Sequence, residues 1–410
     1  MSSRLIEDSR PVAARPRHIA IVAGEHSGDH LGAALMHALQ RLSRDGRLPP
    51  LVFSGVGGAE MTNAGLTSIF PIEDVAVMGP LAIAARLPKI VRRVYQTVDH
   101  VLAQKPDLLV IVDSPEFTHP IAKRVRAKLP ALPIIDYVSP SVWAWRPGRA
   151  AKMKAYISHV LGLLPFEPEA HHRLGGPPCS YVGHPLIEKL EEMRSIQTAA
   201  LEAQLQLRPG KPVLALLPGS RTSEVRRLMG PFLDTVDRML GAGIDFETVI
   251  PALPHVRDFI DSELRSSGLP VYVVEGVDAK LQTFKLATAA LAASGTVSLE
   301  LALMGTPMVI AYKVDVIAAQ VRYILTAHSI VLPNLVLGEN VIPEFTQEKC
   351  SPAELVAALT PLLTKGDAHA AQRRALAEVE ARMRLPDGAA PSDAAAKIAA
   401  AYLMGASKPA

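Results

Sequence analysis

The sequence has little cysteine and no uninterrupted apolar segment long enough to cross a membrane. Its two cysteines, Cys179 and Cys350, exclude a disulfide framework and a cysteine-rich metal cluster, and such low usage is typical of a reducing compartment. The most apolar stretch, 286–312, carries a single charge, Glu300. Turns that contain Gly divide this stretch into pieces too short for a bilayer. We therefore expect a strand, a buried helix and a second strand there, and no transmembrane helix.

A strong excess of charge of either sign is also missing. The net charge of +3 over 410 residues does not favour a general nucleic-acid binder, so we expect no nucleic-acid partner. Residues 1–17 contain several arginines, two acids and no apolar segment, which indicates a disordered tail rather than a secretory signal. The sequence contains no D-x-D motif of two aspartates, and no histidine pair with the spacing H-x-x-x-H encloses a glutamate. We therefore expect no metal site and no cofactor.

Short apolar runs alternate with amphipathic helices along the chain, which is typical of parallel sheets covered by helices on both faces. Because 410 residues exceed one ordinary core, we predict an α/β protein with two Rossmann-like, doubly wound domains that face a central cleft. The predicted units are the tail at 1–17, an N-terminal domain at 18–190, a C-terminal domain at 191–370, and helices at 371–410 that pack back on the N-terminal domain. The strands are expected at 18–23, 51–54, 108–112, 134–138, 160–164, 180–182, 213–217, 247–250, 271–274, 289–293 and 308–311.

The stretch 214–228, LALLPGSRTSEVRRL, contains a buried strand, a Pro-Gly turn and the start of a helix. Free backbone N–H groups at a helix start attract anions. Arg221 lies in the turn and carries a fork of donors that suits phosphate oxygens. The stretch therefore predicts a site for a phosphorylated ligand. The alternative is a plain connection whose arginine faces solvent.

Polar or Gly-rich turns follow several of the other predicted strands. Ligands of open parallel sheets bind at the carboxyl ends of strands, so two facing sheets would place these turns around one cleft. The turn at 24–29 could bind sugar hydroxyls, or it could be only a tight turn before a helix. The glycines at 55–58 form a partial dinucleotide fingerprint without its acidic partner, so we expect no nicotinamide cofactor.

Two single carboxylates and a tryptophan pair are further candidates. Asp113 follows a wholly apolar strand and is either a general base or a helix cap before Pro115. Glu300 lies in an apolar helix and needs a partner, which is either a ribose diol or a buried cation. The stretch 138–149 holds both tryptophans of the chain, as a stacking surface over the cleft or as core.

The stretch 77–98 is apolar apart from four cations, which is the composition of a surface that contacts anionic lipid. The alternative is an ordinary helix with a basic outer face. The cations are Arg86, Lys89, Arg92 and Arg93.

A series of motifs, taken together and in this order, resembles bacterial lipid-A-disaccharide synthases. The most specific of them is SPSVWAWRPGR at 139–149, whereas LLPGSR and SGTVSLE occur loosely in other nucleotide-sugar enzymes. The matching motifs are AGEHSGD (23–29), GVGGAEM (55–61), VMG (77–79), DSPEF (113–117), SPSVWAWRPGR (139–149), VGHPL (182–186), LLPGSR with Glu224 (216–224), SGTVSLE (294–300), PMVIAYK (307–313), LPN (332–334) and PEFTQ (343–347).

The resemblance implies a glycosyltransferase of the GT-B type that inverts configuration at the anomeric carbon. It implies a UDP-2,3-diacylglucosamine donor and a 2,3-diacylglucosamine 1-phosphate acceptor, which give a β-1,6-linked disaccharide 1-phosphate and UDP. The N-terminal domain would take the acceptor and the membrane, and the C-terminal domain would take the UDP-sugar. The implied location is the cytoplasmic face of the inner membrane, against anionic lipid, and a homodimer is left open.

The resemblance also distributes roles among the candidate residues. Asp113 becomes the catalytic base. The donor residues are Gly219, Ser220, Arg221, Ser294, Gly295, Thr296 and Glu300, with Asn334, Glu344 and Gln347 as weaker members. The acceptor residues are Glu25, Ser27, Gly28 and Asp29. The membrane-associating residues are Met78, Leu81, Arg86, Lys89, Arg92 and Arg93.

Two positions depart from the family pattern. Ala82 stands where the family often has a glutamate, which removes one acceptor-binding group, and Glu116 replaces a common aspartate. Two other functions fit the same residues. One is a different GT-B enzyme, such as a UDP-sugar epimerase or a glycosyltransferase of peptidoglycan synthesis. The other is a membrane-surface protein that only binds a nucleotide-sugar.

Overall fold

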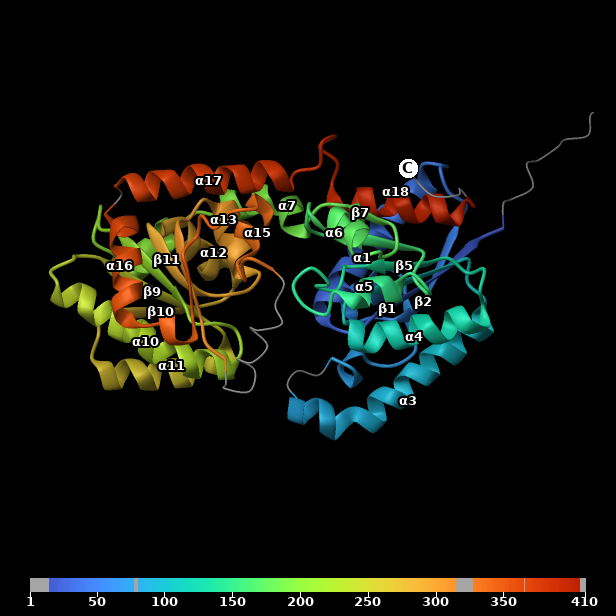
Figure 1. Ribbon diagram of the computed structural model, residues 1–410, viewed down its shortest axis with the longest axis horizontal. Helices are drawn as coiled ribbons and strands as arrows, with labels where there is room; N and C mark the ends of the chain where they lie inside the picture. The colour runs from blue at the N-terminus through green and yellow to red at the C-terminus, as the bar shows by residue number, and fades with distance from the viewer. Residues whose placement is uncertain (1–14, 77–79, 315–326, 365, 406–410) are drawn as a thin grey trace, which may run out of the picture.

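The computed structural model describes residues 15–76, 80–314, 327–364 and 366–405. They form two parallel β-sheets, each with its own covering helices, and the two sheets lie in separate lobes (Figure 1). The predicted fold class, with two Rossmann-like parallel-sheet domains, is confirmed.

The first sheet has seven strands in the order β3-β2-β1-β4-β5-β6-β7, all parallel. The order reverses between β1 and β4, which makes the carboxyl ends of these two strands the topological switch point of the sheet. The run LLVIV in β4 is buried along its whole length, as expected of a strand covered on both faces. The strands are β1 (Arg17–Ala23), β2 (Leu51–Val56), β3 (Thr67–Ser68), β4 (Leu108–Val112), β5 (Ile134–Tyr137), β6 (His159–Gly162) and β7 (Cys179–Tyr181).

The helices of this lobe pack on both faces of the sheet. Helix α1 lays its apolar side, including Leu35 and Leu39, into one of the two clusters that flank the sheet. The elements are α1 (His26–Arg44), α2 (Ala59–Asn63), the 3₁₀ turn η1 (Ile72–Asp74), α3 (Pro80–Gln104), α4 (Pro115–Lys128), α5 (Gly148–Met153), α6 (Glu167–Arg173) and α7 (Pro185–Glu188). The connection to the second sheet contains α8 (Leu190–Ser195) and α9 (Ala199–Leu205).

The second sheet has six parallel strands in the order β10-β9-β8-β11-β12-β13, and its order reverses between β8 and β11. The strands are β8 (Val213–Leu217), β9 (Glu247–Ala252), β10 (Val271–Glu275), β11 (Ala289–Ala293), β12 (Met308–Tyr312) and β13 (Glu344–Thr346). The helices and the 3₁₀ turn η3 are α10 (Thr222–Gly241), α11 (Pro254–Ser267), α12 (Val277–Leu286), α13 (Val297–Met304), α15 (Leu332–Leu337), η3 (Gln347–Lys349) and α16 (Pro352–Leu363).

The last two helices join the lobes. Helix α17 (Asp367–Met383) lies along α13 and α15 of the second lobe, and α18 (Pro391–Leu403) returns to pack on α1 of the first (Figure 1). Arg41 of α1 pairs with Asp393 of α18 at 2.6 Å. Of the predicted C-terminal helices at 371–410, the part in α17 therefore lies on the second lobe and α18 lies on the first.

The structure differs from the prediction at the start of the first strand and at two short strands. Strand β1 begins at Arg17, whose guanidinium binds Asp107 at 2.9 Å, so the last residue of the predicted tail belongs to the sheet. Strands β3 and β13 were not predicted from the sequence. They have only two and three residues. Within the described ranges, none of the helices combines the length and the apolar content that crossing a bilayer requires.

Candidate active site

The carboxyl ends of β1 and β4 bring together the predicted acceptor turn and Asp113. The hydroxyl of Ser27 donates a hydrogen bond of 3.2 Å to Oδ2 of Asp113, and the backbone N–H of Ser114 donates one of 2.7 Å to Oδ1. Asp113 and Ser114 have φ angles of +54° and +46°, in the left-handed region that non-glycine residues rarely occupy. Two consecutive residues held in this region point to a functional turn, because the surrounding structure must offset the strain.

A second carboxylate, Glu25, lies beside Asp113. Burial raises the pKa of Glu25, and the negative charge of Asp113 raises it further. The positive charge of Arg221, which belongs to the other sheet, acts on Glu25 in the opposite direction. The switch points of the two sheets are therefore close enough to act on each other electrostatically, as a site shared by two substrates requires.

Two of the predicted acceptor residues have structural roles in the fold. Asp29 is only 4% exposed, and its carboxylate accepts hydrogen bonds from the backbone N–H groups of Gly58, Glu60 and Met61. It therefore caps the start of α2 and has no free oxygen to offer a sugar. Gly28 is buried where α1 crosses β4, and a Cβ on it would lie 3.1 Å from the carbonyl oxygen of Val112. The assignment of all four residues to the acceptor stays a prediction.

The second sheet has a cavity of about 590 Å³ at its own switch point. Its lining includes the predicted donor residues Gly219, Ser220, Arg221, Ser294, Gly295, Thr296 and Glu300. Gly219 has a φ of +115°, which favours glycine, and a Cβ there would meet the side chain of Glu224 at 2.8 Å. The turn therefore needs glycine for two reasons, and it leads directly into the N-terminus of α10.

Arg221 precedes the first residue of α10 and is oriented by Glu224. Its guanidinium donates a hydrogen bond of 2.8 Å to Oε1 of Glu224, and its backbone N–H donates one of 3.4 Å to Oε2. The Arg221 side chain is 61% exposed, so most of the guanidinium remains open to a ligand in the cavity.

Glu300 also faces this cavity, but it has a protein partner. The ammonium group of Lys280 binds Oε1 of Glu300 at 2.8 Å, and both side chains line the cavity. From the sequence, the partner of Glu300 was either a buried cation or a ribose diol. In the structure the partner is a cation, Lys280. Ser294 donates its hydroxyl to the carbonyl oxygen of Ile330 at 2.8 Å, which leaves Gly295 and Thr296 as the open part of that turn.

The side chains of the three weaker donor candidates form hydrogen bonds within the protein. Asn334 is fully buried, and its amide bonds both the N–H and the C=O of Ile342 at 2.9 Å. Gln347 pairs in the same manner with the backbone of Val314. Both amides therefore join backbone segments, and their assignment to the donor stays a prediction. Glu344 accepts hydrogen bonds on Oε2 from Ser329 and Ile330, and its role in donor binding stays a prediction.

The tryptophan loop at 138–149 packs over the first sheet. The ring of Trp143 lies edge-on to that of Phe166, and its N–H donates a hydrogen bond of 3.2 Å to Glu167. Val138 has a φ of +88°, which is a strained value for a β-branched residue. Trp145 stays half-buried and carries the guanidinium of Arg146 on its face, 4.1 Å from the ring centroid. Trp143 therefore anchors the loop, while Trp145 positions a cation.

Glu167 makes the stability of the folded protein depend on pH. Burial raises its pKa from 4.5 to about 7, although N–H groups of Leu164 and Trp143 bind its oxygens. The folded state thus holds this proton more tightly than the unfolded chain, so the free energy of unfolding falls as pH rises from 4.5 through about 7. A shift of this size corresponds to about 3 kcal/mol.

We expect Glu167→Gln to remove this component of the fall, because the amide cannot ionise. Urea unfolding of parent and variant at pH 5 and pH 8 measures it. Glu169→Gln is the matched control, since Glu169 is exposed on the same helix and should keep the parental pH dependence. An equally steep fall in Glu167→Gln and parent would contradict the assignment to Glu167.

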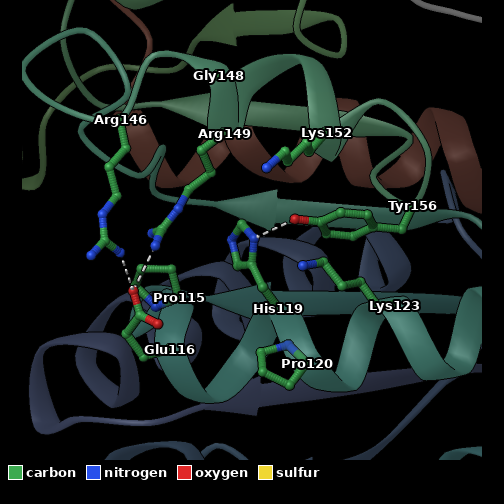
Figure 2. Close-up of a pocket in the computed structure, with 10 residues that line it drawn as sticks. All are labelled: Pro115, Glu116, His119, Pro120, Lys123, Arg146, Gly148, Arg149, Lys152 and Tyr156. Carbon is green, nitrogen blue, oxygen red and sulfur yellow. Dashed lines mark hydrogen bonds and ion pairs between the residues drawn. The ribbon is translucent and has the colours of Figure 1, made fainter.

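A second cavity, of about 410 Å³, lies in the first lobe between α4 and α5 (Figure 2). Its lining includes four cations, of which the sequence analysis noted only the two arginines of the tryptophan loop. The two lysines were missed because they belong to different helices, and no local spacing brings them together. The cations are Lys123, Arg146, Arg149 and Lys152.

Two parallel sheets, each with a switch point at the carboxyl ends of its strands, define a fold of the GT-B type. A UDP-N-acetylglucosamine 2-epimerase from Neisseria meningitidis, solved with UDP-N-acetylglucosamine bound, superposes with a TM-score of 0.55 at 11% identity, covering 95% of this chain and 100% of that one. A glycosyltransferase from Rickettsia africae superposes with a TM-score of 0.58 at 10% identity, over 96% and 100% of the two chains. These likenesses establish the fold alone.

Sequence comparison then specifies the family. The lipid-A-disaccharide synthetase family matches residues 19–398. Proteins described as lipid-A-disaccharide synthases are 48% identical in Bradyrhizobium diazoefficiens, over 94% of this chain and 97% of that protein, and 40% identical in Ruegeria pomeroyi, over 92% and 94%. The chain belongs to the lipid-A-disaccharide synthetase family, and it is a hexosyltransferase.

Proposed function

We propose that this protein transfers 2,3-diacylglucosamine from its UDP donor to 2,3-diacylglucosamine 1-phosphate. The products are the β-1,6-linked disaccharide 1-phosphate and UDP. The observation that carries the proposal is the placement of Asp113 at one switch point while Arg221, at the other, acts electrostatically on the neighbouring Glu25. One substrate bound at each sheet would then meet between a base and an anion-binding turn.

A single displacement that inverts configuration needs one base to take the proton of the acceptor 6-hydroxyl. Asp113 has that role in our proposal, with Ser27 and the N–H of Ser114 holding its two oxygens. Glu25 binds acceptor hydroxyls beside it. Burial and the negative charge of Asp113 both raise the pKa of Glu25, so this carboxylate holds a proton more readily than an isolated glutamate does.

The UDP group occupies the cavity of about 590 Å³ in the second lobe. The charge that develops on the leaving diphosphate is stabilised by Arg221 and by the N-terminus of α10, which begins at Thr222. Glu300, held by Lys280, binds the ribose.

The test is a mass-spectrometric assay with the acylated donor and acceptor, in which the disaccharide 1-phosphate should appear. UDP-N-acetylglucosamine without acyl chains is the control donor. Incubation of the donor alone tests for an epimer. Formation of an epimer without transfer, or binding of the donor without any turnover, would contradict the proposal and support one of the other two functions.

Helix α3 is the proposed membrane-binding surface, on the cytoplasmic face of the inner membrane. Leu87, Val91 and Tyr95 are 52%, 45% and 51% exposed, and their spacing of four residues places them in one stripe along the helix.

Lys89 and Arg93 both bind Asp74 at 2.5 Å, so much of their charge is neutralised within the protein. Of the predicted cations, Arg86 and Arg92 therefore remain for lipid. Met78 lies outside the described residues, as do the side chains of Leu81 and Ala82.

Replacing both Arg86 and Arg92 by Ser should weaken binding to vesicles that contain phosphatidylglycerol by about 30-fold, since each cation near such a surface contributes on the order of 1 kcal/mol. Adding Leu87→Ser and Val91→Ser should abolish co-sedimentation. The pair Arg44→Ser and Arg47→Ser removes the same charge from exposed positions near the end of α1 and serves as control. Parental binding by the α3 variants would show that this face is structural.

A further inference from the structure

We propose that the cavity between α4 and α5 binds the phosphate monoester of the acceptor sugar and thereby selects an acceptor that is phosphorylated at its anomeric position. This inference rests on the proposed function, because it assigns one part of the proposed acceptor to a cavity in the first lobe. It is carried by a cluster of cations, by the place of the cavity next to Asp113, and by the contacts that hold the cations in position.

The cavity contains more positive than negative charge. Arg146, Arg149 and Lys152 extend from the tryptophan loop and α5 toward α4, where Lys123 and the single lining carboxylate, Glu116, face them (Figure 2). Arg149 binds Oε1 of Glu116 at 2.6 Å, and Arg146 lies 3.9 Å from the same oxygen. Among the residues that the structure describes, no carboxylate lies within ion-pair distance of Lys123 or Lys152.

Glu116 neutralises only part of the positive charge of the cavity. Its hydrogen bond to Arg149 is the largest of the effects that lower its pKa, and the charge of Arg146 adds to it. The Glu116 side chain is 78% exposed, so it can move aside at little cost. A phosphate monoester carries up to two negative charges and three terminal oxygens, and it can therefore bind more than one of these cations.

The position of the cavity suits an acceptor whose 6-hydroxyl reaches Asp113. The cavity begins at Pro115, two residues after Asp113, and it continues along α4 as far as Lys123. These residues cover about 12 Å of helix axis, at a rise of about 1.5 Å per residue. C1 and C5, the carbon that bears C6, flank the ring oxygen, so the anomeric phosphate and the 6-hydroxyl leave the ring from two different carbons. A sugar with its 6-hydroxyl at the base can therefore point its anomeric phosphate away from Asp113. The cavity lies in such a direction along α4.

The cations are held by contacts behind them. The ammonium group of Lys123 lies over the ring of Tyr156, 5.0 Å from its centroid, and Arg146 is stacked on Trp145. The Tyr156 hydroxyl lies 2.9 Å from Nδ1 of His119, whose Nε2 lies 3.1 Å from the buried carboxylate of Asp136. This chain of polar groups fixes the floor of the cavity, so less side-chain freedom is lost when an anion binds.

The test compares two acceptors in parent and variant: 2,3-diacylglucosamine 1-phosphate, and the same sugar without its phosphate. Replacing both Lys123 and Lys152 by Gln should raise KM for the phosphorylated acceptor by about 10- to 100-fold, the range expected for lost charge-assisted hydrogen bonds. KM for the donor should stay unchanged. The preference for the phosphorylated over the phosphate-free acceptor, expressed as a ratio of kcat/KM values, should fall by the same factor.

The matched control replaces Lys128 and Lys154 by Gln, which removes the same charge from exposed positions at the ends of the same two helices. This pair should keep the parental ratio. Binding of soluble glucosamine 1-phosphate, followed by ligand-observed NMR with glucosamine as the reference, tests the cavity without acyl chains or turnover. The signal should be present in the parent and in the control pair, and it should be lost in the variant of Lys123 and Lys152.

Each alternative has its own outcome. An unchanged acceptor ratio together with unchanged binding of glucosamine 1-phosphate would overturn the inference. An equal loss with both acceptors, accompanied by weaker binding to phosphatidylglycerol vesicles, would assign the lysines to membrane headgroups and would also overturn it. If the parent transfers to neither acceptor, the proposed function fails. The NMR measurement then decides the phosphate site on its own.

Discussion

Asp113→Asn should lower kcat by about 10²–10⁴-fold, the usual contribution of a positioned general base. The amide keeps the size of the side chain, and its single oxygen can still accept one of the two hydrogen bonds that Asp113 accepts on separate oxygens, from Ser27 or from the N–H of Ser114. It cannot accept a proton at neutral pH. Because the strained turn is set by the backbone and not by the charge, the melting temperature and the affinity for UDP should change little.

Steady-state kinetics with saturating donor measure this effect. Asp45→Asn, at the exposed residue after α1, is the control for the loss of one carboxylate. Glu25→Gln gives the sharper comparison, since Glu25 is the carboxylate beside Asp113 and has the raised pKa. Near-parental kcat in Asp113→Asn, with a large loss in Glu25→Gln, would transfer the role of base to Glu25. If both variants keep kcat, His26 is the next candidate.

Arg221→Lys should weaken UDP binding by about 10- to 100-fold although the charge is kept. The ammonium group offers a single point of charge, whereas the guanidinium can bind Glu224 through one nitrogen and phosphate oxygens through others. A lost charge-assisted hydrogen bond of this kind is worth about 1.5–3 kcal/mol. KM for the acceptor should change less than KM for the donor, because Arg221 lines the cavity of the second lobe.

Calorimetric titration with UDP tests this prediction without acylated substrates. Arg238→Lys, on an exposed position near the other end of α10, is the matched control. Unchanged affinity for UDP and unchanged turnover in Arg221→Lys would reject the phosphate role and leave Arg221 as a residue that only orients the first turn of α10.

Several features of the fold follow from local sequence. Apolar runs such as 108–112 and 213–217 form strands buried on both faces, because a parallel sheet covered by helices accepts only such runs. The turn after β8 was predicted from the Pro-Gly pair between an apolar run and a helix start, and the structure adds that Gly219 is required by its φ of +115° and by the side chain of Glu224. Strand β3 has two residues and no such pattern, so it could not be found.

The functions of individual polar residues follow less well from local sequence. Asp29 and Asn334 belong to motifs of the family pattern, but their partners lie elsewhere in the chain, at Gly58 and Ile342. A carboxylate that caps a helix and one that binds a sugar look alike until the partner is known. Lys123 and Lys152 belong to no motif and were not predicted as site residues. They line one cavity only because α4 lies beside α5.

The sequence by itself determined the class of this protein. Its alternating apolar runs require two parallel sheets, and its motifs indicate the family, because both are properties of residues close together in the chain. Only the tertiary structure decided which polar groups are free to bind a ligand. Asp29 and Asn334 are buried and bonded to backbone groups, and Gln347 is bonded to the backbone of Val314, whereas Asp113 and Arg221 stay partly exposed at the two switch points. A polar group already bound within the protein has little left to offer a substrate, and that depends on contacts between residues far apart in sequence.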